Sequence, residues 1–220
     1  MTVAVKICGL TRPDDAAQAV ASGAAYLGAI LAGGPRLLTF DQARHVLGPR
    51  RPGVQRAAVF GDQSDAEVLT IADALDLDVI QLHGARTPAA VRQLAEQSGR
   101  TVWPVLRVAG PALPPEAEAL AAAAGHLVLD ALVVGQLGGT GVALDWAGLA
   151  ADVTALRRAL PDGRIILAGG LRPSNVAMAI RLLSPDVVDV SSGVETAPGL
   201  KDGALVQQFV AAAHGAAETV

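Results

Sequence analysis

Short apolar runs alternate with amphipathic segments along almost the whole chain. We predict a strand in each of eight runs: residues 3–8, 26–31, 56–60, 78–82, 102–107, 127–130, 164–168 and 187–190. Several runs, such as Ala57-Ala58-Val59-Phe60, are apolar throughout. Continuous runs are typical of parallel strands buried on both faces, because half-exposed strands alternate apolar and polar residues. The pattern therefore predicts a buried parallel sheet.

Helix-start signals lie between the predicted strands. A hydroxyl or carboxylate side chain that can accept a backbone N–H in the first turn predicts the start of a helix. Such residues are Thr11, Thr39 or Asp41, Ser64 and Thr87, and a further start is predicted at residues 172–175. Gly99 and Gly125 predict helix ends, because glycine readily takes the left-handed conformation that follows a helix.

Eight strand–helix units in 220 residues predict a single (β/α)8 barrel domain, a TIM barrel, over residues 1–220. The alternative is an open doubly wound sheet. No G-x-G-x-x-G motif follows the first predicted strand, which argues against a dinucleotide-binding sheet. The active site of such a barrel lies at the carboxyl ends of its strands. Residues that end or follow the predicted strands are therefore the candidates for chemistry.

Composition narrows the function classes. The chain is 51% hydrophobic but only 3% aromatic, so its core must consist mainly of Ala, Val, Leu and Ile. Its net charge of −4 indicates no basic surface for nucleic acid or an anionic membrane. No stretch has the pattern of a signal peptide or a membrane span, so a cytoplasmic location is expected. The apolar balance is compatible with a monomer or a homodimer.

Cys8 is the only cysteine of the chain and ends the first predicted strand. A single thiol excludes an intrachain disulfide and a cysteine-cluster metal site, and the histidines show no ligand spacing, so no metal site is predicted. A free cysteine is most often a small buried hydrophobe. At the tip of a strand, however, Cys8 faces the same rim as the other candidates, which favours a reactive group.

Asp130 ends the sixth predicted strand, directly after three apolar residues. Desolvation favours the protonated form of a carboxyl group, so a carboxyl at this place suits a general acid. A plain turn cap is the alternative. The glycine-rich segment 135–141 that follows is either a lid over the site or an ordinary surface loop.

Two glycine-bearing segments predict a phosphate site. Gly169-Gly170 follows the seventh strand, and Ser191-Ser192-Gly193 follows the eighth. Glycine lets the backbone approach a ligand closely, and the loops after the last two strands are the usual phosphate site of such barrels. Two ordinary turns are the alternative, but a phosphorylated small-molecule substrate is the better prediction.

Arg36 and His83 are candidate substrate ligands on the same rim. Arg36 follows the turn Gly33-Gly34-Pro35, and a guanidinium binds carboxylate or phosphate through paired hydrogen bonds. His83 follows the fourth strand and can hydrogen-bond a substrate. The alternatives are a solvated surface arginine and a structural histidine.

In chain order, the segments at these strand ends resemble the phosphoribosylanthranilate isomerase family of tryptophan biosynthesis. The matching segments are KICGLT (6–11), GPR (34–36), QLHG (81–84), LD (129–130), GGTG (138–141), DW (145–146), LAGGLRPSNV (167–176), VDVSSGVE (188–195) and PGLKD (198–202). Together they span nearly the whole chain, which makes the resemblance specific. The chain departs from the family pattern at residues 29–34, which lack the usual aromatic residues, and at residues 131–134, which are apolar.

The resemblance implies a cofactor-independent Amadori rearrangement of N-(5-phosphoribosyl)anthranilate to 1-(2-carboxyphenylamino)-1-deoxyribulose 5-phosphate. It implies that Asp130 protonates the ribose ring oxygen and that Cys8, as thiolate, removes the C2′ proton. Two alternatives stay open. One is a dual-substrate isomerase of the tryptophan and histidine pathways, which is expected to carry a carboxylate in place of Cys8. The other is a phosphate-binding barrel without activity.

The resemblance also implies substrate contacts. Arg36 matches the arginine that meets the anthranilate carboxylate, and Asp189 lies near the sugar hydroxyls. Gly170 and the Ser192-Gly193 turn match the phosphate cradle.

Overall fold

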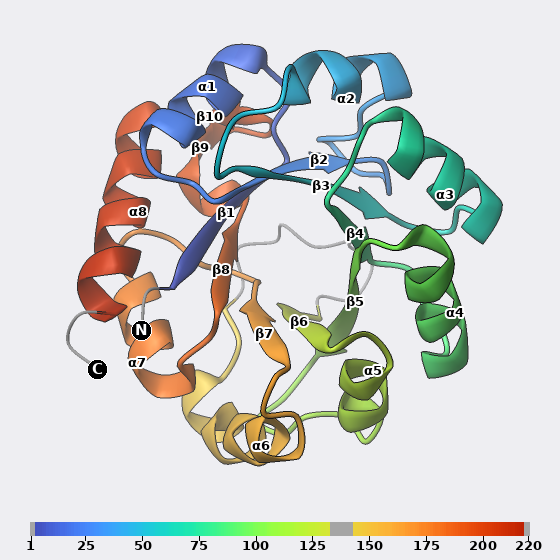
Figure 1. Ribbon diagram of the computed structural model, residues 1–220. Helices are drawn as coiled ribbons and strands as arrows, with labels where there is room; N and C mark the ends of the chain where they lie inside the picture. Colours follow the sequence, from blue (N-terminus) through green and yellow to red (C-terminus); the bar gives the residue numbers. More distant parts are fainter. Residues whose placement is uncertain (1–2, 133–142, 218–220) are drawn as a thin grey trace.

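The structure is a computed structural model that describes residues 3–132 and 143–217, and its strands close into a parallel barrel (Figure 1). The barrel strands are β1 (Ala4–Cys8), β2 (Tyr26–Ile30), β3 (Gln55–Phe60), β4 (Val79–Leu82), β5 (Thr101–Val108), β6 (His126–Ala131), β7 (Arg164–Leu167) and β8 (Val187–Val190). Strands adjacent in sequence are adjacent in the sheet, and β8 pairs with β1 to close it. The predicted barrel is confirmed, and no predicted strand end differs from the observed one by more than one residue.

Helices surround the barrel, as Figure 1 shows. They are α1 (Pro13–Ala21), α2 (Phe40–Leu47), α3 (Asp65–Ala74), α4 (Pro88–Ser98), α5 (Ala117–Ala124), α6 (Trp146–Ala159), α7 (Val176–Leu183) and α8 (Gly203–Ala217). Within the described ranges, none of the helices is long and apolar enough to cross a membrane. The segment 135–141, expected to be a lid or a surface loop, lies outside the described residues.

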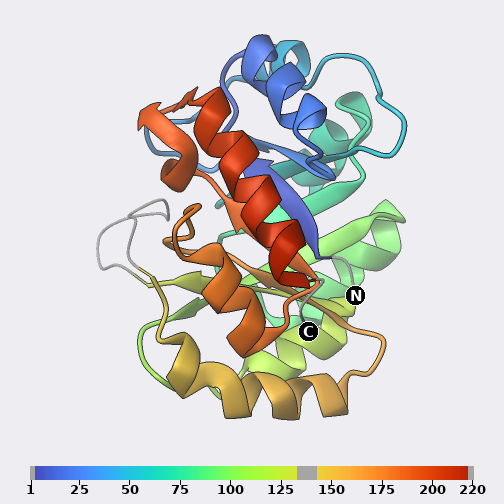
Figure 2. The same cartoon turned by 90° about the vertical axis from the view of Figure 1, so that its left-hand side faces the viewer.

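A short hairpin follows the last barrel strand. The 3-10 turn η1 (Ser192–Val194) leads from β8 into β9 (Glu195–Ala197), which pairs antiparallel with β10 (Leu200–Lys201). Figure 2 shows this hairpin at the same end of the barrel as the loop between β7 and α7. The hairpin therefore lies at the rim where the barrel strands end.

The barrel interior is apolar at one end and polar at the other. A buried apolar cluster fills the barrel: Tyr26, Ala57, Val79, Trp103, Val128, Ile166, Ala168 and Val187. Side chains two positions further along a strand point to the same side. Val79, Val128 and Val187 are thus followed inside the barrel by the buried polar residues Gln81, Asp130 and Asp189. This alternation places polar chemistry at the carboxyl ends of the strands.

Most predicted helix caps are confirmed, and one is wrong. Thr39, Ser64 and Thr87 each accept a backbone N–H at the start of α2, α3 and α4. Thr11, expected to cap α1, instead donates its hydroxyl to the carbonyl of Gly199 at 2.5 Å, and Arg12 precedes the helix without a side-chain cap. The reason is tertiary: the turn between β9 and β10 packs directly on Thr11.

Removal of the Ser64 side chain tests whether this cap stabilises α3. The Ser64 hydroxyl accepts the N–H of Glu67, and the Glu67 carboxylate accepts the N–H of Ser64 at 2.8 Å. We expect Ser64→Ala to lower the free energy of unfolding by about 1 kcal/mol in urea titrations. Thr70→Ala in the same helix is the control and should change it little, because alanine has the higher helix propensity. Equal losses in both variants would contradict the capping role.

Candidate active site

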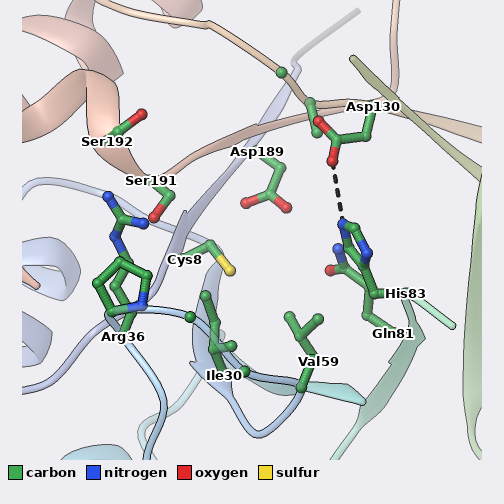
Figure 3. Close-up of a pocket in the computed structure, with 16 residues that line it drawn as sticks. Cys8, Ile30, Arg36, Val59, Gln81, His83, Asp130, Asp189, Ser191 and Ser192 are labelled. Carbon is green, nitrogen blue, oxygen red and sulfur yellow. Dashed lines mark hydrogen bonds and ion pairs between the residues drawn. The ribbon is translucent and has the colours of Figure 1, made fainter. Parts of the chain in front are cut away.

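A pocket lies at the carboxyl ends of the strands (Figure 3). Eight predicted site residues line it: Cys8, Arg36, His83, Asp130, Gly169, Asp189, Ser191 and Ser192. Gly170 and Gly193 adjoin these residues in sequence but do not line the pocket. The closed sheet thus brings together side chains from strand ends that are far apart in the chain.

Cys8 is the last residue of β1, and its sulfur points into the pocket (Figure 3). Only 6% of the residue is exposed. Its neighbour in the register of β2 is Gly28, and a Cβ added at Gly28 would lie 3.0 Å from the Cys8 Sγ. Glycine at this position leaves the space that the thiol occupies.

Lys6 lies on β1 two residues before Cys8, so both side chains point into the barrel. Its ammonium is fully buried and donates to the Asp189 Oδ2 at 2.8 Å. Lys6 and Asp189 are also register partners where β1 pairs with β8. The Asp189 Oδ1 is buried without a hydrogen-bond partner in the described structure, and Asp189 lines the pocket. One oxygen of this carboxylate is therefore left unpaired in the described structure.

The charges around Cys8 act in opposite directions. Burial raises the pKa of the Cys8 thiol, the ammonium of Lys6 lowers it, and the carboxylate of Asp189 raises it, with a net rise. Burial lowers the pKa of Lys6, but Asp189 and the Cys8 thiolate raise it above its ordinary value. Lys6 therefore keeps its proton, and its charge favours the thiolate form of a thiol that burial holds neutral.

Asp130 and His83 form the opposite wall of the pocket (Figure 3). The His83 Nε2 lies 3.2 Å from the Asp130 Oδ2, and the two side chains are 8% and 10% exposed. Gly169 makes room for the carboxylate, because a Cβ there would lie 3.0 Å from the Asp130 Oδ1. The carboxyl group is thus held by a hydrogen bond, mostly screened from water, and directed at the same cavity as the thiol.

The two loops predicted to hold phosphate are in backbone contact. A Cβ added at Gly193 would collide with the carbonyl oxygen of Leu171, so η1 packs directly on the loop after β7. Asn175 holds that loop, since its side chain accepts the N–H of Arg172 and donates to the carbonyl of Gly170 at 2.8 and 2.9 Å. Gly170 and Gly193 therefore contribute to the conformation of the two loops without lining the pocket.

Arg36 lies on the pocket wall and is buried, which excludes the solvated surface alternative. Its guanidinium donates to both carboxylate oxygens of Glu195, at 2.8 and 2.6 Å. Gly9 allows this arrangement, because it has a φ of +68° and an added Cβ would lie 2.5 Å from the Arg36 Cδ.

The sequence of this chain was compared with family models and with curated proteins. The family model of N-(5'phosphoribosyl)anthranilate (PRA) isomerase matches residues 5–212. An N-(5'-phosphoribosyl)anthranilate isomerase of Thiobacillus denitrificans is 41% identical over 214 residues, which cover 97% of this chain and 98% of the relative. The chain belongs to the PRA isomerase family.

Solved structures of PRA isomerases share the fold. The crystal structure from Thermotoga maritima has a TM-score of 0.81 at 30% identity and covers 97% of this chain and 100% of its own. A second PRA isomerase structure, with a TM-score of 0.78, 30% identity and the same coverage, holds reduced 1-(o-carboxyphenylamino)-1-deoxyribulose 5-phosphate. The resemblance seen in the sequence is confirmed at the level of the family.

Lys6, Glu195 and Lys201 belong to the site but were not predicted as site residues. Lys6 had a local signal, a charge inside an otherwise apolar strand. Glu195 and Lys201 had no signal beyond their place in the resembling segments 188–195 and 198–202, because only the hairpin brings them to Arg36 from the other end of the chain. The chain contains two lysines in all, and both are buried here.

Over the described part of the chain, no three His, Cys, Asp or Glu side chains are grouped to hold a metal ion.

Alkylation of the single thiol measures the effect of Lys6. Because iodoacetamide reacts with the thiolate, we expect the pH midpoint of alkylation of Cys8 to lie above that of free cysteine, since burial raises the pKa of this thiol. In Lys6→Met the midpoint should move to still higher pH, because Lys6 is the main group that lowers the pKa. Arg44→Gln, which removes an exposed charge on α2, is the control and should leave the midpoint unchanged. A midpoint for Lys6→Met at or below the wild-type value contradicts this role.

Proposed function

We propose that this chain catalyses the Amadori rearrangement of N-(5-phosphoribosyl)anthranilate to 1-(2-carboxyphenylamino)-1-deoxyribulose 5-phosphate, a step of tryptophan biosynthesis. The observation that carries the proposal is the placement of Cys8 and Asp130 on opposite walls of one pocket in a member of the PRA isomerase family. An acid and a base on two sides of a substrate are what this isomerisation needs.

Two residues carry the proton transfers that open the ring and form the enolamine. Asp130 donates a proton to the ribose ring oxygen, the C1′–O bond breaks, and the nitrogen lone pair forms the C1′=N iminium. The Cys8 thiolate then removes the C2′ proton, and the electron pair of that C–H bond forms the C1′=C2′ bond of an enolamine. Tautomerisation moves the proton of the C2′ hydroxyl to C1′ and gives the aminoketone. Transfer of a proton from the Cys8 thiol to the Asp130 carboxylate through solvent restores both groups.

The pocket offers a place for each part of the substrate. Gly169, Ser191 and Ser192, at the loops after β7 and β8, bind the phosphate, while the free Oδ1 of Asp189 accepts a ribose hydroxyl. The pocket residues Ile30 and Val59 provide apolar side chains for the anthranilate ring (Figure 3). Ile30 lies in the segment 29–34, which lacks the aromatic residues usual in the family. Aliphatic packing therefore replaces aromatic packing on this wall.

The substrate carboxylate is assigned to Arg36. Glu195 engages the Nε and Nη2 atoms, so one edge of the guanidinium is already used. A guanidinium has five N–H donors in a planar fork. The edge that carries Nη1 is left for the anthranilate carboxylate.

The loss of anthranilate-type substrate fluorescence measures the activity. We expect wild-type turnover of freshly made substrate and a kcat lower by about 10²-fold or more in Cys8→Ser and in Asp130→Asn, because a lost general acid or base is worth roughly 10²–10⁴-fold. Asp41→Asn, an exposed carboxylate on α2, is the matched control and should keep wild-type activity. Unimpaired turnover by Cys8→Ser contradicts the base assignment.

The same assay separates the alternatives. Turnover of the corresponding histidine-pathway aminoaldose as a second substrate would indicate a dual-substrate isomerase, and absence of any turnover would indicate a binding protein. Cys8 stands where the dual-substrate enzymes are expected to carry a carboxylate, which favours the single reaction.

A cytoplasmic location goes with this proposal, since a reducing compartment keeps the thiol available as a base. Sedimentation distinguishes the monomer from the homodimer.

A further inference from the structure

Glu195 and Lys201 form a buried charged cluster behind Arg36. The Lys201 Nζ lies 2.6 Å from the Glu195 Oε1, the same oxygen that accepts the Arg36 Nε–H. The side chains are 8% exposed for Arg36, 4% for Glu195 and 1% for Lys201. These three residues are called the Arg36 triad below. No bulk water separates its charges, so they act on each other strongly.

The hydrogen-bond pattern of Lys201 suits the ammonium form. Its Nζ faces three acceptors, namely the Glu195 Oε1, the Ser191 carbonyl at 3.1 Å and the Ser191 hydroxyl oxygen at 3.5 Å. A lysine ammonium supplies three donors and no acceptor, which matches this environment. Burial raises the pKa of Glu195, but Arg36 and Lys201 outweigh this effect and lower it. Burial lowers the pKa of Lys201 below its ordinary value, and the carboxylate of Glu195 opposes this effect. The triad therefore consists of two cations and one carboxylate.

The net charge of the triad determines whether it attracts a carboxylate in the pocket. Arg36 and Glu195 alone would be a neutral pair, and the carboxylate of Glu195 would repel a second carboxylate placed against Arg36. With Lys201 the triad has a net charge of +1. Lys201, which does not line the pocket, donates to Glu195 and leaves the positive charge of Arg36 effective toward a ligand.

The hairpin that carries the two residues is fixed to the first strand–helix unit. Glu195 and Lys201 are register partners in β9 and β10. The Lys201 backbone N–H donates to the Asp15 Oδ2 at 3.1 Å, and the Thr11 hydroxyl donates to the Gly199 carbonyl. Arg12 in turn holds Asp15 through two hydrogen bonds. These contacts anchor the backbone that carries Glu195 and Lys201.

We propose that Lys201, acting through Glu195, is a positioning residue that sets the charge and orientation of Arg36 and thereby selects substrates whose aryl ring carries a carboxylate. This inference rests on the proposed function, in which Arg36 meets the anthranilate carboxylate. It extends that function to specificity. Without the charge of Lys201, the pocket should lose its preference for an aryl carboxylate over an unsubstituted aryl group.

The test compares the binding of two non-reacting ligands by titration calorimetry. One is reduced 1-(o-carboxyphenylamino)-1-deoxyribulose 5-phosphate, and the other is the same compound without the carboxyl group. The measured quantity is the Kd of the ligand without the carboxyl group divided by the Kd of the carboxylated ligand. A high ratio means that the pocket prefers the carboxylate. We expect this ratio to fall about tenfold or more in Lys201→Gln, since loss of a hydrogen bond to a charged group lowers affinity by about that factor. Lys201→Met is the second variant, and thermal melting shows whether each variant folds.

Two further variants show whether a change in the ratio comes from Lys201 acting through Arg36. Arg44→Gln removes an equal charge from an exposed site on α2 and should leave the ratio unchanged. Arg36→Ala should lower the ratio by itself, and Lys201→Gln should have no further effect on the ratio in that background, because Lys201 acts through Arg36. Equal weakening of both ligands by Lys201→Gln overturns the proposal and makes Lys201 merely structural. An unchanged ratio overturns it as well.

The wild-type protein separates this proposal from the proposed function. If the wild type binds neither ligand and turns over no substrate, the proposed function is wrong, and the proposal that rests on it is overturned with it. If the wild type binds the carboxylated ligand and turns over substrate while Lys201→Gln keeps the wild-type ratio, the function stands and only the role of Lys201 is wrong.

Discussion

The buried ion pair of Lys6 and Asp189 joins the first and last strands of the barrel at the seam where the sheet closes. Each charge costs several kcal/mol to bury, and loss of one partner typically costs about 3–5 kcal/mol because the other charge is left alone. The two residues are therefore compatible with the interior only when β1 and β8 pair in this register. The same register puts Cys8 at the rim beside Asp189. The same ion pair therefore belongs both to the closure of the barrel and to the site.

The rim combines three cations with carboxylates that hold them. Lys6 pairs with Asp189, while Arg36 and Lys201 share Glu195. The arrangement suits an anionic substrate and a thiol that must ionise in a buried place, because an opposite charge nearby favours the ionised form. Burial disfavours an ammonium in the interior, and each lysine has a carboxylate that opposes this effect, Asp189 for Lys6 and Glu195 for Lys201. The proposed proton abstraction by Cys8 and the proposed recognition of a carboxylate by Arg36 thus depend on the same principle.

Local patterns predicted the fold well because barrel strands and helix caps follow from short-range sequence. The eight apolar runs became the eight strands, and Ser64 and Thr87 cap the helices expected of them. Thr11 was assigned wrongly for a physical reason: its hydroxyl has a competing partner, the Gly199 carbonyl, on a hairpin 188 residues away. A cap residue with a tertiary competitor looks the same in sequence as one without.

The sequence by itself determined the barrel and the rim, and hence the candidacy of Cys8 and Asp130, because alternation along each strand decides which side chains point inward at its end. The tertiary structure alone decided their partners. Arg36 meets Glu195 across 159 residues, and Lys6 meets Asp189 across 183. No local pattern encodes such pairs, since they exist only once the last strand has closed on the first. Burial then gives these charges their effect, and burial is a property of the closed barrel.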